Sequence, residues 1–267
     1  MSARRYLRKA GEALLPWAFP LAVVAVWEAI AQAGLITPRL LPAPSAVAVA
    51  FWESAKSGVL LHHMGVSAGR ALQGLAIGGA IGFALGVLNG ISRPAETALD
   101  SSMQMLRNVP HLAIIPLVIL WFGIGEEAKI FLVAIGVAFP IYLNTFHGIR
   151  GVDGGLIEMA RVYGLGRWAL FWRVILPGAL PSILVGLRYA LGIMWLTLIV
   201  AETISAQSGI GYMTMNAREF LQTDVVLLGI IIYALLGKLA DMATRWLERR
   251  ALAWHPSFQT QTATVTA

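Results

Sequence analysis

Six long apolar runs dominate the sequence and limit the folds open to it. They lie near residues 14–35, 66–90, 103–122, 128–148, 178–201 and 225–246. A helix needs about 20 apolar residues to cross the hydrocarbon core of a bilayer. The runs therefore predict an all-α polytopic membrane protein with six transmembrane helices.

The composition agrees with this prediction. Hydrophobic residues make up 58% of the chain and charged residues 13%, whereas about a quarter of the residues of an ordinary soluble domain are charged. The chain has no cysteine, which excludes disulfides and cysteine-ligated metal sites and leaves the redox compartment open. The net charge of +6 alone does not indicate a nucleic-acid partner, because in a membrane protein the placement of basic residues matters more than their sum.

Two of the runs are ambiguous. The first follows a basic segment and could pass for a signal peptide ending at 31–33, but the five later runs favour a retained span. The third becomes cleanly apolar only after Arg107 and contains Pro110 and Pro116. Membrane helices tolerate proline where neighbouring helices satisfy the freed carbonyls. Whether this span begins before or after Arg107 stays open.

The basic residues orient the chain. With a cytoplasmic N-terminus, 13 of them fall on the inner side and four on the outer side, while Arg70, Arg188 and Lys238 lie within or beside spans. The inner set is Arg4, Arg5, Arg8, Lys9, Arg93, Arg107, Arg150, Arg161, Arg167, Arg173, Arg245, Arg249 and Arg250, and the outer set is Arg39, Lys56, Lys129 and Arg218. This bias predicts that both termini are cytoplasmic.

The chain then divides into a cytoplasmic segment at 1–13, one transmembrane domain at 14–250 with an inner loop at 150–177, and a polar tail at 251–267. The outer segment 41–58 has a proline-rich entry and then a possible amphipathic helix. The other outer segment, 206–224, has a glycine turn before a weakly helical stretch.

The inner loop has the pattern of two short helices. Asp153 can cap the first, whose Leu156, Ala160 and Tyr163 would share a face, and Gly164 can end it in a left-handed conformation. In the second, Trp168, Phe171, Trp172 and Ile175 recur at helical spacing, an apolar stripe suited to the membrane surface or another protein. Pro177 and Pro181 mark the entry to the fifth span. We expect these two short helices to form a projection on the cytoplasmic face, here called the knob, that docks onto another protein.

This loop resembles the inner loop of binding-protein-dependent ABC importer permeases, whose pattern is E-A-A-x3-G-x9-I-x-L-P. Glu158, Ala160, Gly164, Leu176 and Pro177 match it, whereas Met159 and Val174 depart from it with other apolar residues. Most of the chain is similar to the nitrate, taurine and aliphatic-sulfonate branch of that family, and above all to the aliphatic sulfonate permeases. The segments that carry this similarity include "MLRNVPHLAIIPLVILWFGIGEEAKIFLVA" and "AETISAQSGIGYMTMNAREFLQTDVV".

The resemblance implies a type I importer fold and a permease subunit in the bacterial inner membrane. Its partners would be a second permease copy, two cytoplasmic ATPase subunits that bind ATP and Mg, and an extracytoplasmic binding protein. It also implies that the inner loop seats in a cleft of the ATPase, with Glu158 supplying a charged contact and Gly164 setting the angle between the short helices. Alternatively, Glu158 is a solvated carboxylate that pairs with Arg161. The chain has no G-x-x-x-x-G-K-[ST] motif, so ATP hydrolysis is expected from another chain.

Candidates for a substrate path lie mainly on the fifth span. Arg188 lies about ten residues into it, where it could draw an anion, or could be buried between helices with carbonyl partners or extend inward to the surface. Met194, Trp195 and Thr197 follow it. Glu202 could line the outer mouth or cap a helix end. His62-His63 has no further metal ligand at a suitable spacing, so we expect a solvated outer loop and no metal site.

Other functions remain as alternatives. A nitrate, taurine or related small-anion importer would share this architecture. An ion-coupled secondary transporter would place acidic residues near the bilayer midplane, whereas those of this chain cluster at span ends and loops. An intramembrane enzyme would need a catalytic motif, and neither a histidine after Ser208-Gly209 within the membrane nor H-E-x-x-H is present.

Overall fold

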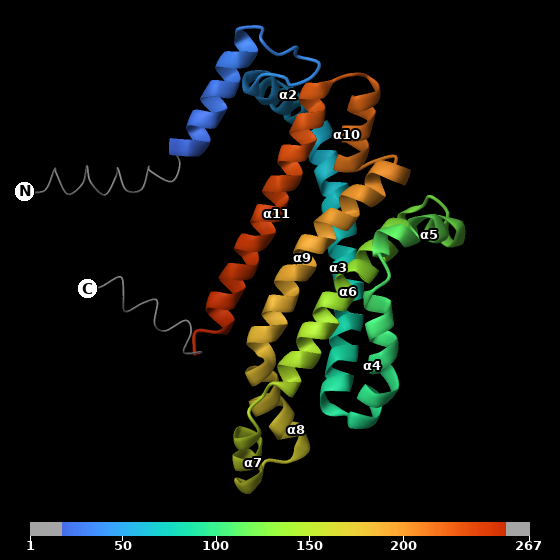
Figure 1. The fold of residues 1–267 in the computed structure, drawn as a ribbon, viewed down its shortest axis with the longest axis vertical. Helices are drawn as coiled ribbons and strands as arrows, with labels where there is room; N and C mark the ends of the chain where they lie inside the picture. Colours follow the sequence, from blue (N-terminus) through green and yellow to red (C-terminus); the bar gives the residue numbers. More distant parts are fainter. Residues whose placement is uncertain (1–17, 255–267) are drawn as a thin grey trace, which may run out of the picture.

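The computed structural model describes residues 18–254, five of them (100, 106, 107, 111 and 205) by their backbone alone. The N-terminal segment 1–13, the start of the first predicted span and most of the polar tail lie outside the described residues. Helices connected by short turns make up nearly all of the described chain (Figure 1). They are the helix Ala18–Gln32, α2 (Pro44–Lys56), α3 (Val59–Ile91), α4 (Arg93–Arg107), η1 (His111–Ile114), α5 (Ile115–Phe122), α6 (Glu126–Arg150), α7 (Gly154–Val162), α8 (Arg167–Leu170), η2 (Phe171–Ile175), α9 (Leu176–Ser205), α10 (Ile210–Glu219) and α11 (Thr223–Ala251).

Among the described residues, four helical segments are long and apolar enough to cross a membrane. They are Val59–Ile91, Glu126–Arg150, Arg167–Ile204 and Thr223–Ala251, and they contain the second, fourth, fifth and sixth predicted spans. The first and third predicted spans fall on the shorter apolar helices Ala18–Gln32 and Leu112–Phe122. The all-α prediction is confirmed. Four of the six apolar runs lie in long helices and the other two coincide with shorter ones.

The third predicted span is not a continuous helix. The chain leaves α4 near Arg107, has non-helical backbone around Asn108 and Val109, and turns through η1 into α5. Proline disfavours helical backbone in the residue before it, which accounts for the break at Pro110. The apolar helix therefore begins after Arg107, which settles the point that the sequence left open. Figure 1 shows α4 returning alongside α3 before α5 projects away from the long helices.

A stripe of glycines joins α3 to α6. Gly74, Gly78, Gly82, Gly86 and Gly90 recur every four residues on α3 and are all buried. A Cβ atom added at these positions would come within 2.0 to 2.7 Å of atoms of α6, the closest being the carbonyl oxygen of Ala134 beside Gly78. Small residues let membrane helices approach this closely and gain van der Waals contact. The other side of α6 packs on α9, where Gly148 lies against Ala179. Hence α6 is the central helix of a three-helix layer.

An apolar cluster closes the end of the molecule opposite α7. It joins Val47 of α2, Leu60 of α3, Ile210 of α10 and Leu228 of α11. The helices predicted in the outer segments 41–58 and 206–224 are thus present as α2 and α10. Since both pack on the long helices, they are fixed parts of this end.

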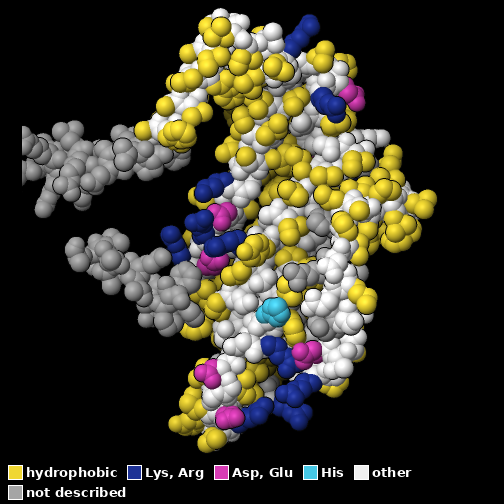
Figure 2. Space-filling view, in the orientation of Figure 1, with side chains coloured by type: hydrophobic (Ala, Val, Ile, Leu, Met, Phe, Trp, Pro, Cys, Tyr) yellow, Lys and Arg dark blue, Asp and Glu magenta, His cyan; other side chains and the backbone are white. Residues whose placement is uncertain are grey.

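Much of the remaining surface is apolar. Figure 2 shows hydrophobic side chains over a large share of the visible face, including the regions of helix Ala18–Gln32 and α5. Leu120 and Trp121 of α5, for example, are exposed. Such a surface is unusual for a soluble monomer and suits contact with lipid or another membrane helix.

Candidate functional site

The turn between α7 and α8 is built from local hydrogen bonds. The Asp153 carboxylate accepts a hydrogen bond from the Gly155 amide at 2.7 Å and caps α7. At the other end of α7, the Gly164 amide donates to the Arg161 carbonyl at 2.9 Å, and the Leu165 amide donates to the Ala160 carbonyl at 3.1 Å. This pair of bonds is a Schellman motif, which needs a left-handed residue. Gly164 supplies it with φ of +80°, as the sequence predicted.

The two short helices form a knob with an exposed carboxylate and exposed apolar side chains. Glu158 is exposed, and within the described part of the chain it has no ion-pair partner, Arg161 included. Val162 and Tyr163 are 86% and 79% exposed. Leu156 and Ala160 lie four residues apart on α7, as predicted, whereas Tyr163 is the residue that caps its end. Of the three, only Ala160 is buried.

The second short helix continues into the fifth span. From α8 the chain passes through the π turn η2 to Leu176, where α9 begins, and Pro177 lies in its first turn. Pro177 has no amide to donate, and it comes directly after the π turn, where the regular hydrogen-bond pattern of the α-helix is already interrupted. Arg167–Ile204 therefore forms one 38-residue apolar helical segment. We predicted an entry to the span at Pro177 and Pro181, but α8 and α9 are joined without a break.

Arg188 has acidic partners on α11. Its Nη2 donates to Glu248 Oε2, and its Nε lies 3.9 Å from Asp241 Oδ1. The Arg188 side chain is 41% exposed. The two carboxylates offset its positive charge, a pairing that the sequence did not indicate because α9 and α11 are distant in the chain.

The other path candidates on α9 point into the bundle. Met194 and Thr197 are buried, and the Trp195 ring packs edge-on against Tyr233 with 6.4 Å between ring centroids. The side chain of Glu202 is also buried. It does not line an open mouth, because its carboxylate is satisfied by donors inside the bundle. One of these donors is the Gly211 amide in the first turn of α10, so of the two predicted roles the structure supports the capping of a helix end.

These donors come from three helices, α3, α10 and α11. Glu202 Oε1 accepts from Arg70 Nη1 at 2.7 Å, and both carboxylate oxygens lie 2.8 Å from the Ser67 hydroxyl. Its Oε2 also accepts from the Gly211 amide and the Tyr233 hydroxyl, each at 2.9 Å. A buried carboxylate is tolerated when it is paired and hydrogen-bonded in this way.

Arg70 connects this carboxylate to a second one. Its Nε and Nη2 donate to the Glu126 carboxylate, with 2.6 Å between Nη2 and Oε1, and its Nη1 donates to the Ser208 carbonyl at 2.6 Å. Arginine presents donors in a fixed fork, so one side chain can hold several acceptors. Arg70 thus ties together α3, α6, α9 and the segment before α10.

His63 belongs to the same end of the molecule. The expectation of a solvated loop at 62–63 is wrong, because α3 begins at Val59 and includes both histidines. His63 Nδ1 accepts a hydrogen bond from the Gly209 amide at 3.0 Å. This histidine therefore helps to position the segment between α9 and α10.

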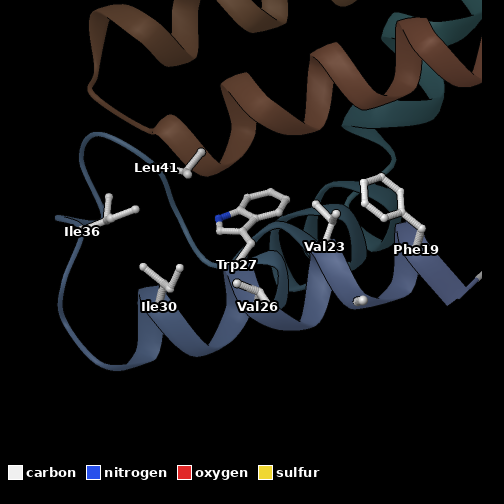
Figure 3. A pocket seen from close by; sticks show the side chains of 8 residues that line it. Phe19, Val23, Val26, Trp27, Ile30, Ile36 and Leu41 are labelled. Atoms are coloured by element: carbon white, nitrogen blue, oxygen red, sulfur yellow. The ribbon is translucent and has the colours of Figure 1, made fainter.

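An apolar cavity of about 480 Å³ lies between helix Ala18–Gln32 and the loop that follows it (Figure 3). Its lining residues are all uncharged and include Phe19, Val23, Trp27 and Leu41. The cavity has no charged group for an anion and suits an apolar chain.

Comparisons with known proteins give a consistent result. Residues 78–252 match the family described as "Binding-protein-dependent transport system inner membrane component". The chain is 62% identical to SsuC of Escherichia coli (strain K12), whose name describes an aliphatic sulfonates transport permease protein, and the match covers 94% of this chain and 95% of that one. It is 36% identical to the taurine transport system permease protein TauC of the same organism, over 92% of this chain and 95% of that one.

A solved structure shares the fold. An amino acid ABC transporter chain superposes with a TM-score of 0.62 at 18% identity, covering 75% of this chain and 97% of that chain. The similarity concerns the arrangement of helices.

Proposed function

This chain belongs to the family of binding-protein-dependent transport system inner membrane components, and from that premise we propose that it is the permease subunit of an ATP-driven importer for aliphatic sulfonates. One observation carries the substrate class: identity is 62% to the aliphatic sulfonates permease SsuC and 36% to the taurine permease TauC, over similar shares of the chain. Permeases of this family have a separate ATPase subunit.

The proposed assembly contains two copies of this permease, two ATPase subunits that bind ATP and Mg, and an extracytoplasmic binding protein. In the proposed orientation both termini and the α7–α8 knob face the cytoplasm, and α2 and α10 face the binding protein. The positive residues Arg93, Arg150, Arg161, Arg167 and Arg173 near the knob support this orientation, since basic residues are enriched on the cytoplasmic side.

The proposed coupling begins at the knob. Glu158 and the exposed apolar side chains around it would seat in the ATPase, because a partly apolar surface that also carries exposed charges suits a protein partner. Movement of α7 would pass through the Gly164 turn to α8 and, by the unbroken helix, to α9. That helix carries Arg188, Trp195, Thr197 and Glu202, the proposed path residues.

The charges on α9 suit a weakly held anion. A sulfonate carries one negative charge on an apolar tail, and a path that bound it tightly would not release it. Arg188 could attract the head group only weakly, because Glu248 and Asp241 offset its charge. Around this residue the helix is apolar, as the tail of an alkanesulfonate requires.

Reconstituted transport tests the function. The permease, its ATPase and its binding protein should take up an alkanesulfonate in proteoliposomes only with ATP, and binding protein loaded with substrate should raise ATPase activity. Uptake driven by an ion gradient without ATP would instead indicate a secondary transporter.

In cells, a deletion strain should fail to grow on an alkanesulfonate as sole sulfur source and grow normally on sulfate. If the deletion strain lost only taurine or nitrate uptake, the importer function would stand, but the substrate would be taurine or nitrate.

Charge reversal tests the knob. Glu158→Lys should weaken copurification with the ATPase, whereas Glu219→Lys, at another exposed site, on α10, should not.

Single cysteines test the orientation, since the chain has none of its own. Ser57→Cys and Glu127→Cys should react from outside, and Thr97→Cys and Glu158→Cys from inside. An outside reaction at position 158 would rule out docking to a cytoplasmic ATPase.

A further inference from the structure

A second cavity, of about 820 Å³, lies at the α7–α8 end of the molecule. One side is formed by the last turns of α3 and the start of α4, and the other by α7, α8 and the π turn η2. The cavity thus lies between the knob and the end of α3. The coupling function assigned to the knob does not account for it.

Three arginines line this cavity. Arg93 comes from α4, Arg161 from α7 and Arg167 from α8. All three are exposed, and no carboxylate of the described residues forms an ion pair with any of them. By contrast, the nearby Arg150 is paired with Glu96. In Figure 2 dark blue side chains gather between α4 and the two short helices. The cavity therefore has a concentrated positive charge without a partner.

Apart from Ser92, the rest of the lining is apolar, and it lies at the ends of the membrane spans. Val87 and Ile91 are in the last turns of the span Val59–Ile91, and Phe171 and Ile175 are in the first turns of the span Arg167–Ile204. Trp168, also in the lining, is 76% exposed. Tryptophan is enriched where a membrane meets water. The charged and apolar parts are thus arranged in the order of a lipid head group and its chains.

We propose that this cavity binds an anionic phospholipid of the cytoplasmic leaflet. The lipid phosphate contacts Arg93, Arg161 and Arg167, since the guanidinium fork matches phosphate oxygens. An acyl chain covers the wall of Val87, Ile91 and Ile175. A free anion would leave this wall bare, and an acidic protein segment would bring no alkyl chain. Basic pockets between membrane helices on the cytoplasmic side bind anionic head groups in this manner.

The proposal rests on the proposed orientation but not on the transported substrate. Since Arg161 and Arg167 flank the Gly164 turn, one lipid would hold α7 and α8 against the end of α3. The lipid would then be a third component of the joint between the knob and the membrane helices.

Lipid titration of the full-length protein tests the site. Nanodiscs with rising fractions of phosphatidylglycerol in phosphatidylcholine are analysed by native mass spectrometry for retained lipid. Wild-type protein should retain phosphatidylglycerol in preference to phosphatidylcholine. The triple variant Arg93→Gln, Arg161→Gln, Arg167→Gln should bind it more weakly by roughly a factor of five per arginine, on the order of a hundredfold in all. The matched control Arg173→Gln, Arg249→Gln, Arg250→Gln removes as much charge from residues outside the cavity and should bind like the wild type.

A second variant separates a built site from general charge attraction. Ile91→Trp fills the apolar wall at an exposed position and leaves every arginine in place, and it should also lose the retained lipid. Equal retention by wild type and triple variant would overturn the proposal. So would displacement of the lipid by hexanesulfonate at the concentration that supports transport, which would assign the cavity to substrate. Loss of the ATPase from the triple variant with lipid retention unchanged would assign the arginines to a protein contact. The alkanesulfonate uptake assay, run separately, reports on the proposed function.

Discussion

Arg70 of α3 and Glu202 of α9 form a buried ion pair with 2.7 Å between Nη1 and Oε1. The side chain of Arg70 is 2% exposed and that of Glu202 is 0% exposed, so neither charge is compensated by water. Each is instead held by further partners, Arg70 by Glu126 and Ser208, and Glu202 by Ser67 and Tyr233. The pair fixes how α3 and α9 meet at the end opposite the knob.

Removing one member of this pair should destabilise the protein strongly. Arg70→Met leaves the Glu202 carboxylate buried without a cation, and breaking a buried pair in this way costs about 3–5 kcal/mol. We expect a large fall in the thermal midpoint measured by tryptophan fluorescence in detergent. Arg218→Met, at an exposed arginine at the same end of the molecule, should leave the midpoint unchanged. Equal midpoints for the two variants would mean that water reaches Glu202.

The glycine stripe gives a steric prediction. In Gly78→Val the new Cβ would lie 2.0 Å from the Ala134 carbonyl oxygen, so α3 and α6 would have to separate. Overpacking of this kind costs about 1–3 kcal/mol and here acts on the central contact. We expect low yields of folded protein by size-exclusion chromatography. Gly65→Val on the same helix has nothing within 4 Å of the new Cβ and should behave like the wild type. A normal yield of Gly78→Val would contradict the close packing of α3 on α6.

The α7–α8 turn gives a prediction about coupling. Gly164→Val puts a β-branched residue at φ of +80°, where it is strained, and should re-aim α8 while the spans stay folded. ATPase stimulation by loaded binding protein should be lost with the amount of protein in the membrane unchanged. Gly166 has an extended backbone with φ of −66° and open space around it, so Gly166→Val is the control and should retain stimulation. Stimulation of Gly164→Val at the wild-type level would show that the angle of the turn has no role.

Arg188 has two candidate roles that can be separated. Arg188→Met should lower alkanesulfonate uptake and cost about 1 kcal/mol of stability, a small figure because the pair with Glu248 is partly exposed. Adding Glu248→Gln removes the unpaired carboxylate and should restore the thermal midpoint. If Arg188 also attracts the substrate, uptake stays low in the double variant. Full recovery of uptake would make Arg188 a structural ion-pair residue only.

The long spans were predictable because each is a local property of the sequence. The helices α3, α6, α9 and α11 each contain an apolar run, and the left-handed Gly164 follows a short helix with a capping aspartate. The break in the third span was harder to predict, because proline is often accommodated inside membrane helices and only the backbone before Pro110 decides the outcome. The glycine stripe did have a signal, a four-residue repeat from Gly74 to Gly90 that an apolar-run search overlooks.

The ion pairs could not be predicted in the same way. Arg70 and Glu202 are 132 positions apart, and no local pattern relates them. Arg188 and Glu248 are likewise 60 positions apart and meet only because α9 and α11 pack together. The turn at Gly164 could be predicted because its hydrogen bonds lie within one short loop, whereas the contact of Glu158 with an ATPase stays a prediction. The surroundings of Arg188 and Glu202 could not be predicted, because they depend on how the helices pack together.

The length of α9 also has a mechanical consequence. At about 1.5 Å of rise per residue, its 30 residues form a helix roughly 45 Å long. A tilt of α9 by about 5° around its first turn, next to the knob, would move its other end by roughly 4 Å. Leverage of this kind amplifies a small angular input into a displacement large enough to change which side chains meet at the opposite end, where Glu202 now holds Arg70.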